Sequence, residues 1–134
     1  MTQSLFEYPV HLGAGGSAAA QPAFTGMACY ADYTERTAGD GSDGRLVGMH
    51  QFNADWDSRE LHPAGDELVV CLAGSIVLHQ ELTDGNKATV MLAASEYAIN
   101  PPGAWHTADV DKAATCLFIT AGIGTEHRPR LAGK

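Results

Sequence analysis

The sequence predicts an all-β protein, either a sandwich or a small barrel, on the basis of two observations. From Thr25 onward, short apolar, β-branched or aromatic stretches alternate with breaks rich in Gly, Pro, Asn and Asp. Helical periodicity is almost absent from the same region. Many short strands at close spacing favour a sandwich or barrel, because such a chain must cover both its apolar faces and its sheet edges.

Turn-forming residues bound each expected strand. The strands are expected at residues 27–34, 46–53, 67–72, 75–82, 88–92, 96–99, 106–109 and 115–120. The breaks include a glycine- and aspartate-rich run at 39–44, Ala73-Gly74, Asp84-Gly85-Asn86 and Pro101-Pro102-Gly103. We expect Gly74 to form a tight hairpin that sends the chain back as strand 75–82.

The chain divides into three segments within one domain, as its 134 residues indicate. Residues 1–24 form an arm with alternating apolar residues, expected to be an extra edge strand or an arm exchanged within a dimer. Residues 25–122 form the barrel. Residues 123–134 form a C-terminal tail, expected on the outside of the barrel, with pocket closure or a dimer contact as alternatives.

Composition excludes several classes of partner. A net charge of −8 repels phosphate backbones, so we expect no nucleic-acid partner. No apolar run approaches the length of a membrane span, so we expect no membrane partner. Three widely spaced cysteines and no sign of an export signal favour the reducing cytoplasm, with Cys71 and Cys116 as packing residues.

Two imidazoles and one carboxylate, from His62, Glu67 and His106, are ligand types of a divalent-metal site. The Pro-Ala-Gly-Asp turn at 63–66 lets Glu67 face the same interior as His62. The Pro-Pro-Gly turn at 101–103 is rigid and fixes the direction from which the following strand brings His106 to the other two ligands. The spacing leaves the metal open among Fe, Mn, Zn and Ni.

The same residues carry a family resemblance. Residues 60–74, ELHPAGDELVVCLAG, resemble the first motif of the cupin superfamily, and PPGAWH at 101–106 resembles the second, PxGxxH. HPAGDE and the later GTEHRP also resemble stretches of a group of small single-domain cupins. The resemblance implies a double-stranded β-helix, or jelly-roll barrel, whose mouth opens on a ligand pocket. It also implies a homodimer, because pairing of barrels covers exposed sheet edges.

Glu60 departs from the family pattern, since many metal-binding cupins carry the first histidine of an HxH pair there. We consider three roles for it: a fourth metal ligand that favours Mn or Fe, a base beside a three-ligand site, or a side chain turned to solvent. Ser95 and Val110 also depart from the pattern, standing where glycine and asparagine are usual.

The other histidines have weaker claims. On an extended strand His50 lies on the same face as Leu46 and Phe52 and could point into the barrel. His79 lies on the face opposite to its apolar neighbours Ile76 and Leu78. We expect His11 at the surface and His127 in the tail. Core packing is the simpler role for Trp56 and Trp105, although either could wall a pocket.

The function expected from these residues is a metal-binding cupin that transforms or holds a small organic molecule. An Fe(II) dioxygenase is the first reaction to consider, because two histidines and one carboxylate leave positions for dioxygen and substrate. A metal-dependent isomerase with Glu60 as catalytic base, a non-catalytic sensor and a metal-free relic are the alternatives. Few basic residues near the motifs argue against a phosphate-bearing substrate.

Overall fold

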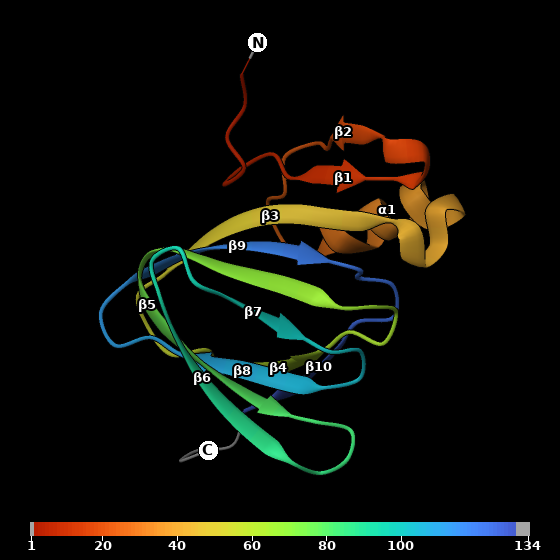
Figure 1. Ribbon diagram of the computed structural model, residues 1–134. Helices are drawn as coiled ribbons and strands as arrows, with labels where there is room; N and C mark the ends of the chain where they lie inside the picture. Colours follow the sequence, from red (N-terminus) through yellow and green to blue (C-terminus); the bar gives the residue numbers. More distant parts are fainter. Residues whose placement is uncertain (1, 131–134) are drawn as a thin grey trace.

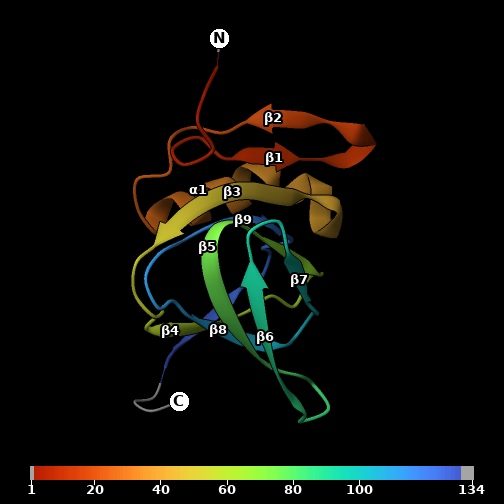
Figure 2. The same ribbon diagram turned by 60° about the vertical axis from the view of Figure 1, so that its left-hand side comes forward.

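Two antiparallel sheets share one long strand in the computed structural model, which describes residues 2–130 (Figures 1 and 2). The elements are β1 (Val10–Leu12), η1 (Ala14–Gly16), β2 (Ala18–Ala20), α1 (Ala28–Thr37), η2 (Ala38–Asp43), β3 (Arg45–Phe52), β4 (Ser58–Leu61), β5 (Glu67–Glu81), β6 (Lys87–Ala93), β7 (Tyr97–Asn100), β8 (Trp105–Asp109), β9 (Ala114–Thr120) and β10 (Glu126–Pro129). No helix among these residues is long and apolar enough to cross a membrane.

The strands pair in the order β2-β1-β3-β9-β5-β7 in one sheet and β10-β4-β8-β5-β6 in the other. Every pairing is antiparallel, and the sheets wrap around one interior as a jelly-roll barrel (Figure 1). The all-β prediction is therefore confirmed. Strands β3 and β6 to β9 begin and end within one residue of the expected positions.

Strand β5 corrects the expected hairpin at Gly74. The chain does not turn back there but continues as one strand, pairing with β9 and β7 in its first half and with β6 and β8 in its second. A register shift between Cys71 and Ala73 and a φ of +73° at Gly74 bend it from one sheet into the other. A β-carbon at Gly74 would collide with the carbonyl of Ala113, so the bend requires glycine.

Residues 28–37 form helix α1, so the expected strand at 27–34 is wrong. Tyr30 and Tyr33 are three residues apart and lie on one helical face, where both rings pack against Phe24. The Thr37 hydroxyl donates to the carbonyl of Tyr33, as is common in helices. Tyrosine is common in strands, which is why this segment was expected to be one. The spacing of three between Tyr30 and Tyr33 instead follows the helical period.

The N-terminal arm extends the first sheet as the hairpin β1–β2, with β1 paired to β3. His11 on β1 is buried, not at the surface as expected. Its Nδ1 lies 2.6 Å from the hydroxyl of Tyr33, and its Nε2 lies 2.6 Å from the carboxylate of Asp40, whose pKa is lowered by this bond. His11 thereby joins the arm to α1 and η2.

The apolar core fills the barrel interior between the two sheets. Its fully buried centre is Val69, Cys71, Ile76, Leu78, Ala108 and Cys116. The inward residues of β5 alternate with partly exposed ones on either side of the bend, as a strand between interior and solvent requires. Ser95 has a φ of +75°, which explains why glycine is usual at that position.

We expect one fast-reacting thiol in the native protein. Hydrogen bonds from Thr25 lower the pKa of Cys29, whereas burial raises the pKa of Cys116 to about 12 and encloses Cys71. Titration with an aromatic disulfide reagent at mildly alkaline pH should modify Cys29 alone, and Cys29→Ser should abolish the fast phase. Rapid native reaction of two or more thiols would contradict the packing of the core.

Candidate metal centre

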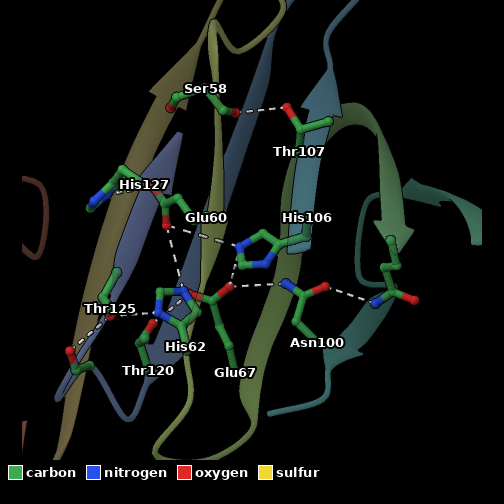
Figure 3. A network of polar contacts seen from close by, with 12 residues as sticks. Ser58, Glu60, His62, Glu67, Asn100, His106, Thr107, Thr120, Thr125 and His127 are labelled. Carbon is green, nitrogen blue, oxygen red and sulfur yellow. Dashed lines mark hydrogen bonds and ion pairs between the residues drawn. The ribbon is translucent and has the colours of Figure 1, made fainter. Parts of the chain in front are cut away.

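Four side chains converge at one end of the barrel from three neighbouring strands (Figure 3). Glu60 lies on β4 directly opposite His106 on β8, and Glu67 is the first residue of β5. His62 follows β4 by one residue, so it reaches the same space as Glu60. The turn at 63–66 then turns the chain so that Glu67 faces the two histidines, as the sequence predicted.

The ligand atoms lie close enough to share one ion. Glu67 Oε2 lies 3.2 Å from His62 Nε2, and Glu67 Oε1 lies 3.2 Å from His106 Nε2. Glu60 Oε2 lies 3.5 Å from His62 Nε2 and 4.0 Å from His106 Nε2. Ligands on one metal, with bonds of about 2.1 Å, are roughly 3.0–3.4 Å apart. Glu67 matches that separation, through a different oxygen for each imidazole. Glu60, His62 and His106 each offer one ligand atom, and these three atoms lie within 4.8 Å of one another.

Glu67 is fixed by uncharged donors behind it. The Thr120 hydroxyl donates to Oε2 at 2.6 Å, and the Asn100 amide donates to Oε1 at 3.0 Å. Gln80 donates in turn to the Asn100 carbonyl oxygen at 2.8 Å. Each carboxylate oxygen therefore has one fixed donor and faces one imidazole. Such support from outer residues is typical of metal ligands.

Thr125 sets the tautomer of His62. The Thr125 hydroxyl donates to the carbonyl of Gly122 at 2.8 Å, so its oxygen accepts the contact with His62 Nδ1, also 2.8 Å long. His62 Nδ1 must then carry the hydrogen. The lone pair of Nε2 is left directed toward the carboxylates, which is the tautomer required for a metal ligand.

The donor set fits a divalent cation. His62 Nε2 and both ring nitrogens of His106 are buried without a hydrogen-bond partner among the described residues, since the approaches to Glu67 lack hydrogen-bond direction. Burial alone would raise the pKa of Glu67, but the two imidazoles outweigh burial and hold it well below its usual range. The Glu67 and Glu60 carboxylates raise the pKa of His62 against the effect of burial. The centre therefore attracts positive charge.

Residues 123–130 border the metal centre, so they do not form the tail on the outside of the barrel that was expected. Residues 131–134 lie outside the described part of the chain. Strand β10 pairs with β4 and places His127 opposite Glu60. His127 Nε2 lies 3.6 Å from Glu60 Oε1, which turns the other Glu60 oxygen toward the imidazoles. Glu60 thus lies between His127 and His106 across three strands (Figure 3).

The other candidates from the sequence, His50, His79 and Trp56, differ in where they lie relative to the centre. His50 is exposed, and its ring centroid lies 5.7 Å from that of the buried Phe118 and 6.2 Å from that of Phe52. His79 points outward to Asp109 at 2.7 Å and takes no part in the centre. Trp56 packs against the core with its ring centroid 6.3 Å from that of His106.

The sequence did not indicate that Asn100 and Thr120 bond to Glu67, or that Thr125 bonds to His62. Strand parity in 115–120 would have put Thr120 on the same face as Cys116 and Phe118, but the sequence does not show that this face meets Glu67. Register supplies that information, because Glu67 is paired with Thr120 on one side and Asn100 on the other.

Solved structures with the same arrangement were found. Oxalate oxidase matches with a TM-score of 0.54 and 14% identity, over 69% of this chain and 50% of that chain. The chain has the cupin fold. Hydroquinone 1,2-dioxygenase from Sphingomonas sp. TTNP3 with 4-hydroxybenzoate bound matches the chain with a TM-score of 0.50 and 18% identity, over 57% of this chain and 58% of that chain. A cupin superfamily protein from Desulfitobacterium hafniense DCB-2 gives a TM-score of 0.48 and 19% identity, over 57% of this chain and 65% of that chain.

The chain therefore spans only 50% and 58% of the first two proteins, and at these identities the likeness concerns the fold alone. No family model matches the chain. No curated protein matches it either.

Thr125→Val should weaken metal binding about 10- to 100-fold, the usual effect of losing a supporting hydrogen bond. The change keeps the shape of the side chain but removes the acceptor of the His62 Nδ1 hydrogen. Thr125→Ser should retain near-native affinity. Chelator competition with Mn²⁺ or Zn²⁺ measures both variants, and equal affinities for Val and Ser would exclude the tautomer role.

The metal-free protein should lose stability as pH rises above about 6.5. The pKa of His62 is raised in the folded state, so the contribution of protonated His62 is fully present below its unfolded value of about 6.5 and is lost above the folded pKa. Melting temperature against pH should fall more steeply for the native chain than for His62→Gln. A divalent metal should restore the alkaline stability of the native chain, and identical pH profiles for the two chains would contradict the pairing.

Proposed function

We propose that this cupin binds one divalent metal ion through His62, Glu67 and His106, with Glu60 as a fourth ligand, and oxidises a small uncharged organic molecule with dioxygen. The observation that carries the proposal is that the buried Nε2 atoms of His62 and His106 face carboxylates and have no hydrogen-bond partner within residues 2–130. Two imidazoles beside carboxylates suit Fe(II) or Mn(II).

The metal, when bound, supplies a Lewis-acidic centre with positions left for dioxygen and a chelating substrate. The chain supplies a rigid frame for it. Glu67 stays ionised, although its side chain is only 4% exposed, because the Thr120 and Asn100 donors and the imidazoles stabilise its charge. His62 is held in one tautomer by Thr125.

We infer that the aromatic rings next to the imidazoles favour a flat, apolar substrate. Trp56, Phe52 and Phe118 have ring centroids 5.3–6.2 Å apart, and the Trp56 ring meets His106 edge-on. The described arginines that follow the centre are engaged elsewhere: Arg128 lies over Trp105, and Arg130 pairs with Asp109. A phenol or an enol suits such apolar surroundings better than a phosphate ester.

Glu60 favours a second candidate, metal-assisted enolisation or isomerisation. Its side chain is 29% exposed, in contrast to 4% for Glu67, and one of its oxygens contacts His127, not a buried imidazole. A carboxylate with access to solvent can accept a proton from a bound substrate and release it. The same centre without turnover would serve as a small-molecule sensor.

Metal content tests the centre directly. Purified without chelators, the protein should contain one metal ion per chain by elemental analysis, whereas His62→Ala and His106→Ala should each lower affinity by more than about 100-fold. His79→Ala is the matched control, because His79 bonds to Asp109 on the outer surface. If both His62→Ala and His106→Ala still contain one metal ion per chain, the proposed ligand set is wrong.

Oxygen consumption separates the reactions. The Fe(II)-loaded protein should consume dioxygen with at least one member of a panel of phenols and enolisable diketones, and phosphate esters should be inactive. Glu60→Gln should weaken metal binding if Glu60 is a ligand. If Glu60 is the base and not a ligand, Glu60→Gln should retain the metal but abolish deuterium exchange into an isomerised substrate. Tight metal binding with neither reaction would favour the sensor.

A further inference from the structure

His50 lies on the inner face of the barrel although it is exposed to solvent. On β3 it is paired with the buried Cys116 of β9, and cross-strand partners share one face of a sheet. Its ring also lies near those of Phe118 and Phe52. A residue on the inner face can be exposed only where that face is open to solvent, so His50 borders the open part of the barrel.

The imidazole of His50 is directed along β3 toward the metal centre. A β-carbon at Gly48 would lie 3.6 Å from His50 Nε2, so the ring folds back over Gly48. The next inner position of β3 is paired with Thr120, which is paired in turn with Glu67. Alternate residues of a strand are about 7 Å apart, so one inner position separates Gly48 from the row that carries Glu67.

Helix α1 brings Tyr30 to the same side. A row of paired residues that crosses β3 and β9 joins His11 of β1 to Glu67, and such a row shares one face of the sheet. The His11 ring contacts Tyr33, so α1 lies on the face that carries Glu67. Tyr30 precedes Tyr33 by about one helical turn, and both rings pack against Phe24. In both views α1 lies beside β3 (Figures 1 and 2).

The charges of the centre act on both side chains. Burial raises the pKa of Tyr30, and the carboxylates of Glu60 and Glu67 raise it further. Burial lowers the pKa of His50, whereas the same two carboxylates oppose this effect. Both groups therefore lie within electrostatic range of the ligands, and both are uncharged at neutral pH.

A chain of aromatic rings connects His50 to the ligand His106. The ring centroid of Phe118 lies 5.7 Å from that of His50 and 6.2 Å from that of Trp56. The Trp56 centroid lies 6.3 Å from that of His106. A flat molecule next to these rings would therefore have the metal centre at one end and His50 at the other.

The polar atoms of Tyr30 and His50 have no partner within residues 2–130. In this part of the chain neither the Tyr30 hydroxyl nor a ring nitrogen of His50 forms a hydrogen bond or an ion pair. The neighbouring Tyr33 and His11 are instead bonded to each other. An uncharged phenol and an uncharged imidazole each offer one donor, and an uncharged oxygen atom can accept both.

We propose that Tyr30 and His50 bind the far end of the substrate and donate hydrogen bonds to an uncharged oxygen there, while its other end binds at the metal centre. The substrate class is then a flat phenol or enol that carries a second hydroxyl or carbonyl oxygen opposite its metal-binding oxygens. This inference rests on the proposed function, because it requires a substrate bound at the metal.

Two matched ligands test the proposal. 4-(Hydroxymethyl)catechol and 4-ethylcatechol differ only by a hydroxyl in place of a methyl group. Calorimetric titration into the full chain loaded with Zn²⁺ measures both affinities without oxidation, because Zn²⁺ has no redox chemistry. The native chain should prefer the hydroxymethyl ligand about 10-fold, and Tyr30→Phe and His50→Leu should each reduce this preference at least about threefold.

Conservative and control variants separate a lost hydrogen bond from a lost fold. His50→Gln should keep most of the preference, because the glutamine amide can still donate. Tyr97→Phe and His79→Leu are the matched controls, since Tyr97 is exposed on β7 and His79 bonds to Asp109. Both controls should keep the full preference. Zinc content and affinity for 4-ethylcatechol should stay native in all variants.

Zinc content is measured first, so that two kinds of failure can be told apart. A chain that binds no Zn²⁺ would overturn the metal centre, and this inference with it. A zinc-loaded native chain that binds the two catechols equally would overturn this inference alone. A preference that survives both Tyr30→Phe and His50→Leu would overturn it as well.

Discussion

Burial of the Glu67 carboxylate is the constraint on which the rest of this structure depends. An ionised carboxylate in an interior costs several kcal/mol unless each oxygen is hydrogen-bonded and a positive partner is near. Here β9 supplies Thr120, β7 supplies Asn100, and the imidazoles approach from β8 and from the end of β4. The first residue of β5 thus requires four other segments of the barrel to lie in register around it.

The bend at Gly74 makes that arrangement possible. Because β5 passes from one sheet into the other, its first half carries Glu67 to the centre while its second half pairs with β8, which carries His106. Val69, Cys71 and Leu78 then fill the interior next to the centre without exposure to solvent. Close packing beneath the centre restricts movement of the ligand side chains away from one another, as a preorganised metal site requires.

Strand alternation lets one strand serve two surfaces. On β5, Glu67 and Val69 face the centre and the core, while Leu68 and Val70 are partly exposed on the opposite face of the sheet. The C-terminal strand β10 has a comparable double role, since its pairing with β4 closes the sheet and its approach brings Thr125 and His127 to the ligands. Tail, barrel and centre therefore form one cooperative unit.

The sequence by itself determined the all-β class, most strand positions and the four residues at the centre, because strand alternation, turn residues and motif spacing are local properties. It did not determine α1, where two tyrosines read equally well as strand composition, nor the bend at Gly74, since a hairpin and a bend both use a positive φ. It also could not place Asn100, Thr120, Thr125 or the buried His11. Those positions depend on which distant strands pair and in what register, and only the tertiary structure decides that.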